Sequence, residues 1–174
     1  NIGTDLRQTH PFSIPASGSP KVRAPTGHAR VRADGAGLVQ CTSCHDPHSE
    51  FGGSTEGKFL VQGTARSELC TTCHPAVAGS SHFSSSQAMA AKAKAGETAY
   101  ATVADAGCMG CHRSHGASPK GQLLRLEAAE ADDAVCLRCH STGNGASDVG
   151  REVAKPSSHR VPGRHDADEG PTSA

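Results

Sequence analysis

Aromatic side chains are nearly missing from this sequence, which has no Trp, one Tyr and four Phe among 174 residues. Because large apolar side chains supply most of the area that an ordinary core buries, a core of normal size is hard to build from this chain. The shortage also argues against a nucleic-acid surface, since bases stack on aromatic side chains and the basic residues here are scattered. We therefore expect no nucleic-acid partner.

An excess of charge of one sign and a long apolar run are missing too. Lys plus Arg and Asp plus Glu number 17 each, so the polypeptide is formally neutral, which favours self-association. No apolar run reaches the roughly 20 residues of a membrane-spanning helix, so we expect no membrane span. No signal peptide is recognisable, and we expect Asn1 to be a mature or trimmed start.

Cysteine, by contrast, follows one pattern, because all eight cysteines lie in four Cys-x-x-Cys-His motifs. This spacing is typical of haem attachment, in which two thiols add to the vinyl groups of one porphyrin and the adjacent His binds its iron. A zinc ribbon or a redox dithiol also uses Cys-x-x-Cys, but neither requires the following His. We expect four covalently bound haem c groups, with thioether cysteines Cys41, Cys44, Cys70, Cys73, Cys108, Cys111, Cys136 and Cys139 and proximal ligands His45, His74, His112 and His140.

Four porphyrins, as large flat apolar bodies, would replace the missing side-chain core, so we expect the haem-free chain to be largely unfolded. The expected fold class is mostly irregular coil with short α-helices around the haems, with little or no β-sheet, because no alternating apolar run is long enough. We expect a helical turn at each haem motif. Further helices are expected over 87–95, capped within 84–86 and stopped by Gly96, and over 122–131.

The four motifs form two similar pairs, since Cys70 follows Cys41 by 29 residues and Cys136 follows Cys108 by 28. Each pair also places a further His three residues after its first proximal His. This repeat predicts two di-haem modules. The expected parts are an extended N-terminal arm (1–40), module 1 (41–74), a linker with a short helix (75–107), module 2 (108–140) and a C-terminal tail (141–174).

The repeated histidines, His48 and His115, are the first candidates for distal iron ligands. Three residues are too few to reach the opposite face of the same iron, so each is expected on the second haem of its own module. His10 and His82 lie upstream of the two modules in similar Phe/Ser surroundings and are expected on the first haems.

The remaining histidines leave alternatives open. His28 competes with His10 for the first haem, and His159 could serve a haem in another subunit, whereas His165 is expected at the surface. Met109 lies inside a motif and Met89 in an expected helix, so neither is expected to bind iron. All four irons are therefore expected to be bis-His and low-spin.

These residues resemble the doubled-motif multihaem c-type cytochromes of metal- and sulfur-metabolising bacteria. Residues 41–48 match the usual first motif of that family, and 59–60 with 68–70 match the usual approach to the second. Residues 3–6 and 10–13 resemble the upstream ligand segment, which favours His10 over His28. The resemblance covers about residues 1–140.

The resemblance implies bis-His haems in alternating parallel and T-shaped pairs and a role in extracellular electron transfer. Some relatives polymerise into filaments in which a His of one subunit ligates a haem of the next. This chain departs from the pattern at Arg113-Ser114, where module 1 has Asp46-Pro47.

An electron carrier is therefore the expected function, either as a filament subunit or as a discrete shuttle, with copies of itself or other multihaem cytochromes as partners. Spare histidines near both ends favour the filament. A multihaem reductase is the alternative, but catalysis needs an iron with an exchangeable position, and the surplus of His argues against one. We expect no catalytic residue. Thioether attachment of haem occurs outside the cytoplasmic membrane, which predicts a periplasmic or cell-surface location.

Overall fold

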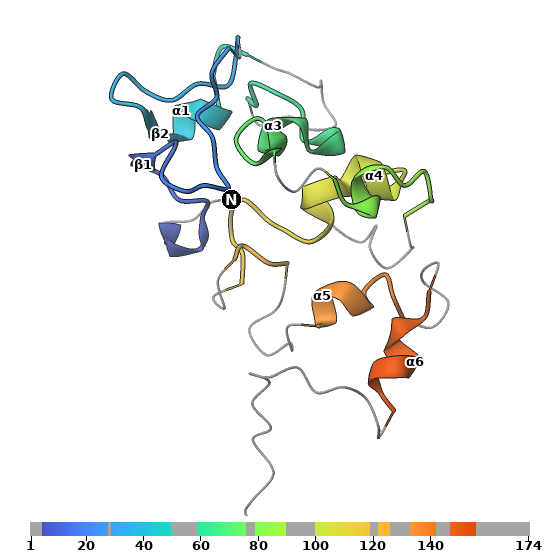
Figure 1. Cartoon of the computed structure of the whole chain (residues 1–174). Coiled ribbons are helices and arrows are strands. Elements are labelled where there is room, and N and C mark those ends of the chain that lie inside the picture. The colour runs from blue at the N-terminus through green and yellow to red at the C-terminus, as the bar shows by residue number, and fades with distance from the viewer. Residues whose placement is uncertain are drawn as a thin grey trace, which may run out of the picture.

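The structure, a computed structural model, is drawn in Figure 1 and describes residues 5–27, 29–49, 59–75, 79–89, 100–118, 122–125, 133–141 and 147–155. Its α-helices are α1 (Cys41–Cys44), α3 (Glu68–Thr71), α4 (Val103–Ala106), α5 (Ala134–Leu137) and α6 (Val149–Val153). Its 3₁₀ turns are η1 (Leu6–Gln8), η2 (Ala65–Ser67), η4 (Ser81–Phe83) and η5 (Gly107–Gly110). The strands are β1 (Ile14–Pro15) and β2 (Leu38–Val39).

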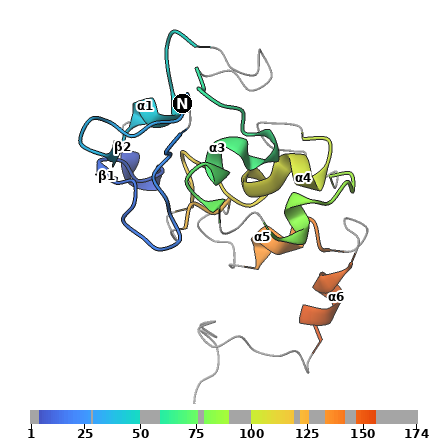
Figure 2. The same ribbon diagram turned by 45° about the horizontal axis from the view of Figure 1, so that its top comes forward.

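The elements are short and widely spread. In both views, β1, β2 and α1 lie on one side, α3 and α4 lie centrally, and α6 lies far from α1 (Figures 1 and 2). Within the described ranges no helix is long and apolar enough to cross a membrane. The expected class, mostly coil with short helices and little sheet, is confirmed.

The protein interior is built from small side chains. Among the described residues the buried hydrophobic side chains are Ala16, Val31, Val61, Met89, Ala104, Ala106 and Ala117. Larger ones, including Leu6, Ile14 and Phe59, are exposed. Helices of four or five residues are unstable by themselves, so this small interior has little apolar area with which to hold them.

The N-terminal arm folds back on itself and then crosses both modules. β1 pairs antiparallel with β2, with Ile14 opposite Val39. Upstream of that ribbon, the His10 N–H donates to the Ser114 carbonyl over 2.8 Å, and the Ala117 N–H donates to Gln8 over 3.1 Å. Residues 8–10 therefore lie along the loop that follows the third haem motif.

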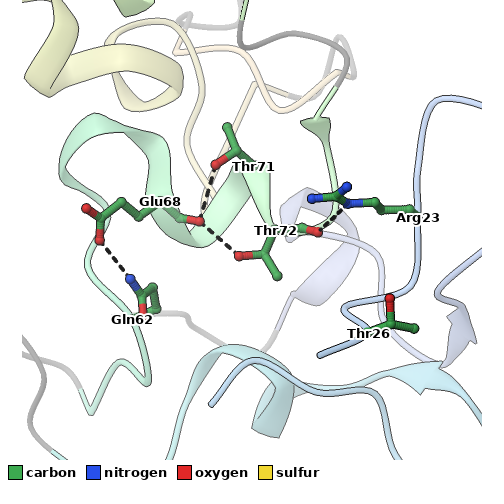
Figure 3. Close-up of a pocket in the computed structure, with 6 residues that line it drawn as sticks. All are labelled: Arg23, Thr26, Gln62, Glu68, Thr71 and Thr72. Carbon is green, nitrogen blue, oxygen red and sulfur yellow. Dashed lines mark hydrogen bonds between the residues drawn. The ribbon is translucent and has the colours of Figure 1, made fainter. Parts of the chain in front are cut away.

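The arm also reaches the second motif. The Arg23 N–H donates to the Cys73 carbonyl over 2.9 Å, and Arg23 Nε donates to the Thr72 carbonyl over 3.4 Å. Figure 3 shows these side chains around a polar pocket of about 310 Å³ that is lined by Arg23, Thr26, Gln62, Glu68, Thr71 and Thr72. No Cys or His lines this pocket, and its walls join the arm to α3.

The two modules share one backbone arrangement. His45 pairs with Leu60 in an isolated antiparallel bridge, and His112 pairs with Leu124 in the same way. Two further hydrogen bonds flank each bridge at equivalent positions. They run from Asp46 N to Phe59 O and from Val61 N to Cys44 O in module 1, and from Arg113 N to Leu123 O and from Arg125 N to Cys111 O in module 2.

Module 2 meets module 1 where α4 and η5 contact η2. Ser67 is fully buried, and its hydroxyl oxygen accepts a 2.8 Å hydrogen bond from the Cys108 N–H. Gly107 packs so closely here that an added Cβ would lie 2.0 Å from Ser67 Oγ, and its φ of +44° suits glycine. The third haem motif thus begins directly against the approach to the second.

Two expected helices are wrong where the structure describes them. At the start of 87–95, Ala88 forms a bridge with Thr102, and the Met89 N–H donates to the Ala101 carbonyl. At the start of 122–131, Gln122 and Leu123 both have a φ of +55°, which a right-handed helix forbids. In both places the backbone bonds to a distant segment instead of its own next turn; residues 90–99 and 126–132 lie outside the described ranges.

Candidate haem-attachment sites

Each Cys-x-x-Cys-His motif forms one helical turn, as expected. The N–H of the motif's His donates to the carbonyl of its first Cys over 2.9, 2.9, 2.8 and 2.9 Å in motifs 1 to 4. Positions i, i+3 and i+4 share one face of a helix, so this turn places both thiols and the imidazole on one side. Two thioether bonds and an iron ligand therefore come from the same face, which suits a single porphyrin.

Three of the four proximal histidines face another histidine. The ring centres of His45 and His115 are 6.0 Å apart with an interplanar angle of 28°. Those of His74 and His10 are 6.2 Å apart at 72°. Those of His140 and His82 are 6.1 Å apart at 80°.

These distances fit an iron between two imidazoles. A bond of about 2 Å from each nitrogen to a shared metal, with each nitrogen about 1 Å from its ring centre, separates the ring centres by about 6 Å. The near-parallel rings of His45 and His115 would lie closer together than that if they were in direct van der Waals stacking. The donor set at motifs 1, 2 and 4 therefore fits a bis-His haem.

Backbone carbonyls orient several of these rings. Nδ1 of His112 lies 2.9 Å from the Gln122 carbonyl oxygen, Nδ1 of His140 lies 3.2 Å from that of Ser147, and Nδ1 of His10 lies 2.9 Å from that of Pro11. When Nδ1–H donates to such a carbonyl, Nε2 carries the lone pair that binds a metal. A carbonyl partner at Nδ1 thus fixes both the tautomer and the direction of the ring.

Two of the rings are kept neutral by their surroundings. Burial lowers the pKa of His74, and the neighbouring His10 and His112 rings lower that pKa further. Burial likewise lowers the pKa of His115, with additional effects from His45 and His10. Only a neutral imidazole has a lone pair for a metal, so the lowered pKa favours ligation.

The cysteine sulfurs show which motifs are neighbours. The Cys70 thiol donates a hydrogen bond to the Cys108 sulfur, which raises the pKa of Cys70 and lowers the pKa of Cys108. Burial raises the pKa of Cys44, and nearby Cys73 and then Cys41 raise it further. Motif 2 therefore lies beside motif 3 and also beside motif 1.

Motif 4 lies beside motif 3. Burial raises the pKa of the Cys111 thiol, and the adjacent thiols of Cys136 and Cys139 raise it further. Thioether sulfurs do not titrate, so in the haem-bound chain these contacts matter for position. They place the motifs in the spatial order 1, 2, 3, 4.

The ring pairs differ from those expected from sequence. The structure places His10 against His74 of motif 2 and not against His45 of motif 1, because the hydrogen bonds between the arm and residues 114–117 hold it there. It places His115 against His45 and not against His140. Spacing from a proximal His did not by itself show which distant motif each ring reaches.

Of the other candidate ligands, His82 and His48 lie elsewhere than at their expected motifs, and the rest are outside the described ranges. His82 faces His140 of motif 4, whereas it was expected at His112 of motif 3. His48 was expected at motif 2, but its side chain is 91 % exposed, and its Nδ1 lies 3.3 Å from Asp46 Oδ1. His28, His159 and His165 lie outside the described ranges.

Comparison with known proteins gives one match. A family model described as the doubled CXXCH motif matches residues 28–79 and again residues 101–145, which together make up more than half of the chain. No curated protein and no solved structure matches this sequence.

Proposed function

The chain belongs to the doubled CXXCH motif family, and from that premise we propose that it carries four haems as a subunit of an extracellular electron-conducting filament. The motifs indicate covalently bound haem c, so the protein is a multihaem c-type cytochrome whose general role is electron transfer. The number of haems, the assembly and the extracellular site of action are the parts that we propose.

The order of the motifs in space is the observation that carries this proposal. Sulfurs of motifs 1 and 2, of motifs 2 and 3, and of motifs 3 and 4 influence one another directly. Each haem would supply a ferric/ferrous couple, and four haems attached at these positions would be neighbours in a row. Electrons can pass along such a row without any substrate site.

The residues of the chain maintain iron sites that are closed to substrates. Paired histidines at motifs 1, 2 and 4 would supply two ligands to each iron, and carbonyl partners hold the rings of His112 and His140 in place. A reductase needs at least one iron with an exchangeable position. The paired histidines therefore support a carrier over a multihaem reductase.

Two observations support assembly over a discrete shuttle, and a third supports a location outside the cytoplasm. The polypeptide has no formal net charge, so its own residues do not oppose association, while the propionates of bound haem would add a small negative charge. The sequence also holds five histidines outside the three ring pairs, and such a surplus supports ligation between copies. Haem attachment through CXXCH motifs takes place outside the cytoplasmic membrane, which supports a periplasmic or cell-surface site.

Intact mass spectrometry of the native protein, together with electron microscopy, tests the proposal. We expect the polypeptide mass plus four haems, a low-spin ferric spectrum and regular thin filaments. A mass corresponding to fewer than four haems would overturn the tetrahaem assignment. Four haems in compact particles only would reject the filament and leave a discrete electron shuttle.

A further inference from the structure

The three ring pairs follow a rule set by the repeat. His10 and His82 lie upstream of modules 1 and 2, and each faces the second proximal histidine of its own module, His74 or His140. Both pairs have steeply inclined planes, at 72° and 80°. Equivalent positions in the two modules thus have equivalent partners.

The third pair links the modules. His115, three residues after the first proximal histidine of module 2, faces His45, the first proximal histidine of module 1, with planes inclined by 28°. In this pair the histidine at that position faces the first motif of the module before its own.

Applied to module 1, the same rule concerns His48, which is equivalent to His115. Its partner should be the first proximal histidine of a preceding module. Among the described residues, the first proximal histidine that has no ring pair is His112. Among the described residues neither the His48 ring nor the His112 ring lies against another histidine ring.

Both rings are prepared for ligation. His48 has a 91 % exposed side chain, and its backbone N–H donates to Asp46 Oδ1 over 2.9 Å while its Nδ1 lies 3.3 Å from the same oxygen. A carboxylate at Nδ1 leaves Nε2 as the basic nitrogen, as the carbonyl of Gln122 does for His112. His112 is an exposed residue as well.

We propose that His48 of one copy is the second axial ligand of the haem attached at Cys108 and Cys111 in another copy, opposite His112. The inference rests on the proposed function, because it requires a haem at motif 3, and it identifies the partner as a second copy of this chain. Donor and acceptor are different residues, so each copy can bind one neighbour through His48 and another through His112. Such a head-to-tail contact that does not close into a ring produces an open filament.

Dilution of the unaltered protein gives the first test. As assemblies dissociate, the third haem loses His48, so about one quarter of the ferric iron should become high-spin and bind carbon monoxide once reduced. Sedimentation velocity and optical spectra recorded at each concentration should show the loss of assemblies and the high-spin band together. Monomers in which all four haems stay low-spin would overturn the inference and place the fourth ligand within one chain.

Two variants distinguish ligation from a general structural effect. His48→Ala should give monomers with one high-spin haem, and added imidazole should restore the low-spin spectrum without restoring assembly. The matched control, His115→Ala, should also make one haem high-spin, but at every protein concentration and even in assemblies. A His48→Ala protein that still assembles with four low-spin haems would contradict the proposal.

The measurements separate this inference from the proposed function. Haem content by intact mass, recorded for each variant, shows whether motif 3 carries a haem at all. A chain with fewer than four haems refutes the tetrahaem assignment, whereas four haems that are low-spin in the monomer refute only the contribution of His48.

Discussion

An iron needs a neutral imidazole whose basic nitrogen points at it, and single residues arrange both conditions in this protein. Backbone carbonyls next to Nδ1 orient His10, His112 and His140, while burial lowers the pKa of His74 and His115. Ligand quality is therefore determined at the residue scale, by one hydrogen bond or by local burial.

The two kinds of ring pair predict different effects of removing one histidine. Near-parallel imidazole planes give low-spin ferric haem a rhombic electron paramagnetic resonance signal, and near-perpendicular planes give a highly anisotropic one. His115→Ala should weaken the rhombic component, because its ring lies at 28° to that of His45. His10→Ala should weaken the anisotropic component instead, because its ring lies at 72° to that of His74.

Low-temperature spectra of the two oxidised variants, recorded at equal haem content, check this prediction. The variants serve as controls for each other, since each removes one distal candidate. Loss of the anisotropic signal in His115→Ala would show that His115 does not serve the iron at His45.

Gly107 is a second position where one atom matters. Gly107→Ala should lower the free energy of unfolding of the haem-bound protein by about 3 kcal/mol, from strained backbone and from contact with Ser67. An added Cβ there would lie 2.0 Å from Ser67 Oγ, whereas nothing lies within 4 Å of a Cβ added at Gly35. Gly35→Ala, as the control, should change the same quantity by less than about 0.5 kcal/mol.

Denaturant titrations of both variants measure the difference. Equal stabilities for Gly107→Ala and Gly35→Ala would mean that the contact between η5 and η2 is not tightly packed.

At the scale of elements, capping partly replaces length. α4 has four residues, too few for a stable helix alone, but Thr102 and Asp105 form a reciprocal capping box at its start. The Thr102 side chain accepts a hydrogen bond from the Asp105 N–H over 3.1 Å. Since α4 leads directly into η5, this cap positions the third haem motif.

Removing that cap should measurably lower the stability of the folded protein. Thr102→Ala is expected to lower the free energy of unfolding by about 1 kcal/mol, because the Asp105 N–H loses its partner. Ser86→Ala, at an exposed residue, serves as the control and should be nearly neutral. Thermal unfolding of the two variants followed in the Soret band compares them, and equal midpoints would contradict a stabilising role for the cap.

At the scale of the whole molecule, the interior explains why a cofactor is needed. Its buried hydrophobic side chains, where described, are mostly Ala and Val, and such residues bury too little area to offset the entropy of ordering the chain. Stability is therefore expected to come largely from covalently attached haem, whose large apolar surface the folded chain would bury.

The haem-free chain is accordingly expected to be largely unfolded. Polypeptide produced without haem attachment should show a far-ultraviolet circular dichroism spectrum of irregular chain and no cooperative thermal transition. The haem-bound protein in the same buffer is the control. A native-like spectrum from the haem-free chain would show that the polypeptide folds without its cofactor.

Local features were readable from the residues. Positions i, i+3 and i+4 share one helical face wherever that turn forms, so Cys41, Cys44 and His45 could be grouped from sequence alone. The lack of a long alternating apolar run likewise predicted little β-sheet in a mostly irregular chain. Both conclusions depend on neighbours within a few residues or on composition, and neither requires knowledge of long-range contacts.

The choice of partner depended on the folded chain. His10 reaches His74 because its segment hydrogen-bonds to Ser114, and His115 reaches His45 across the two modules. The helices expected from Gln87 and Gln122 do not begin there because their backbone groups bond to distant segments. Weak local preferences, each worth a fraction of a kcal/mol, are overridden by such long-range hydrogen bonds, so only the tertiary structure determines which histidine faces which motif.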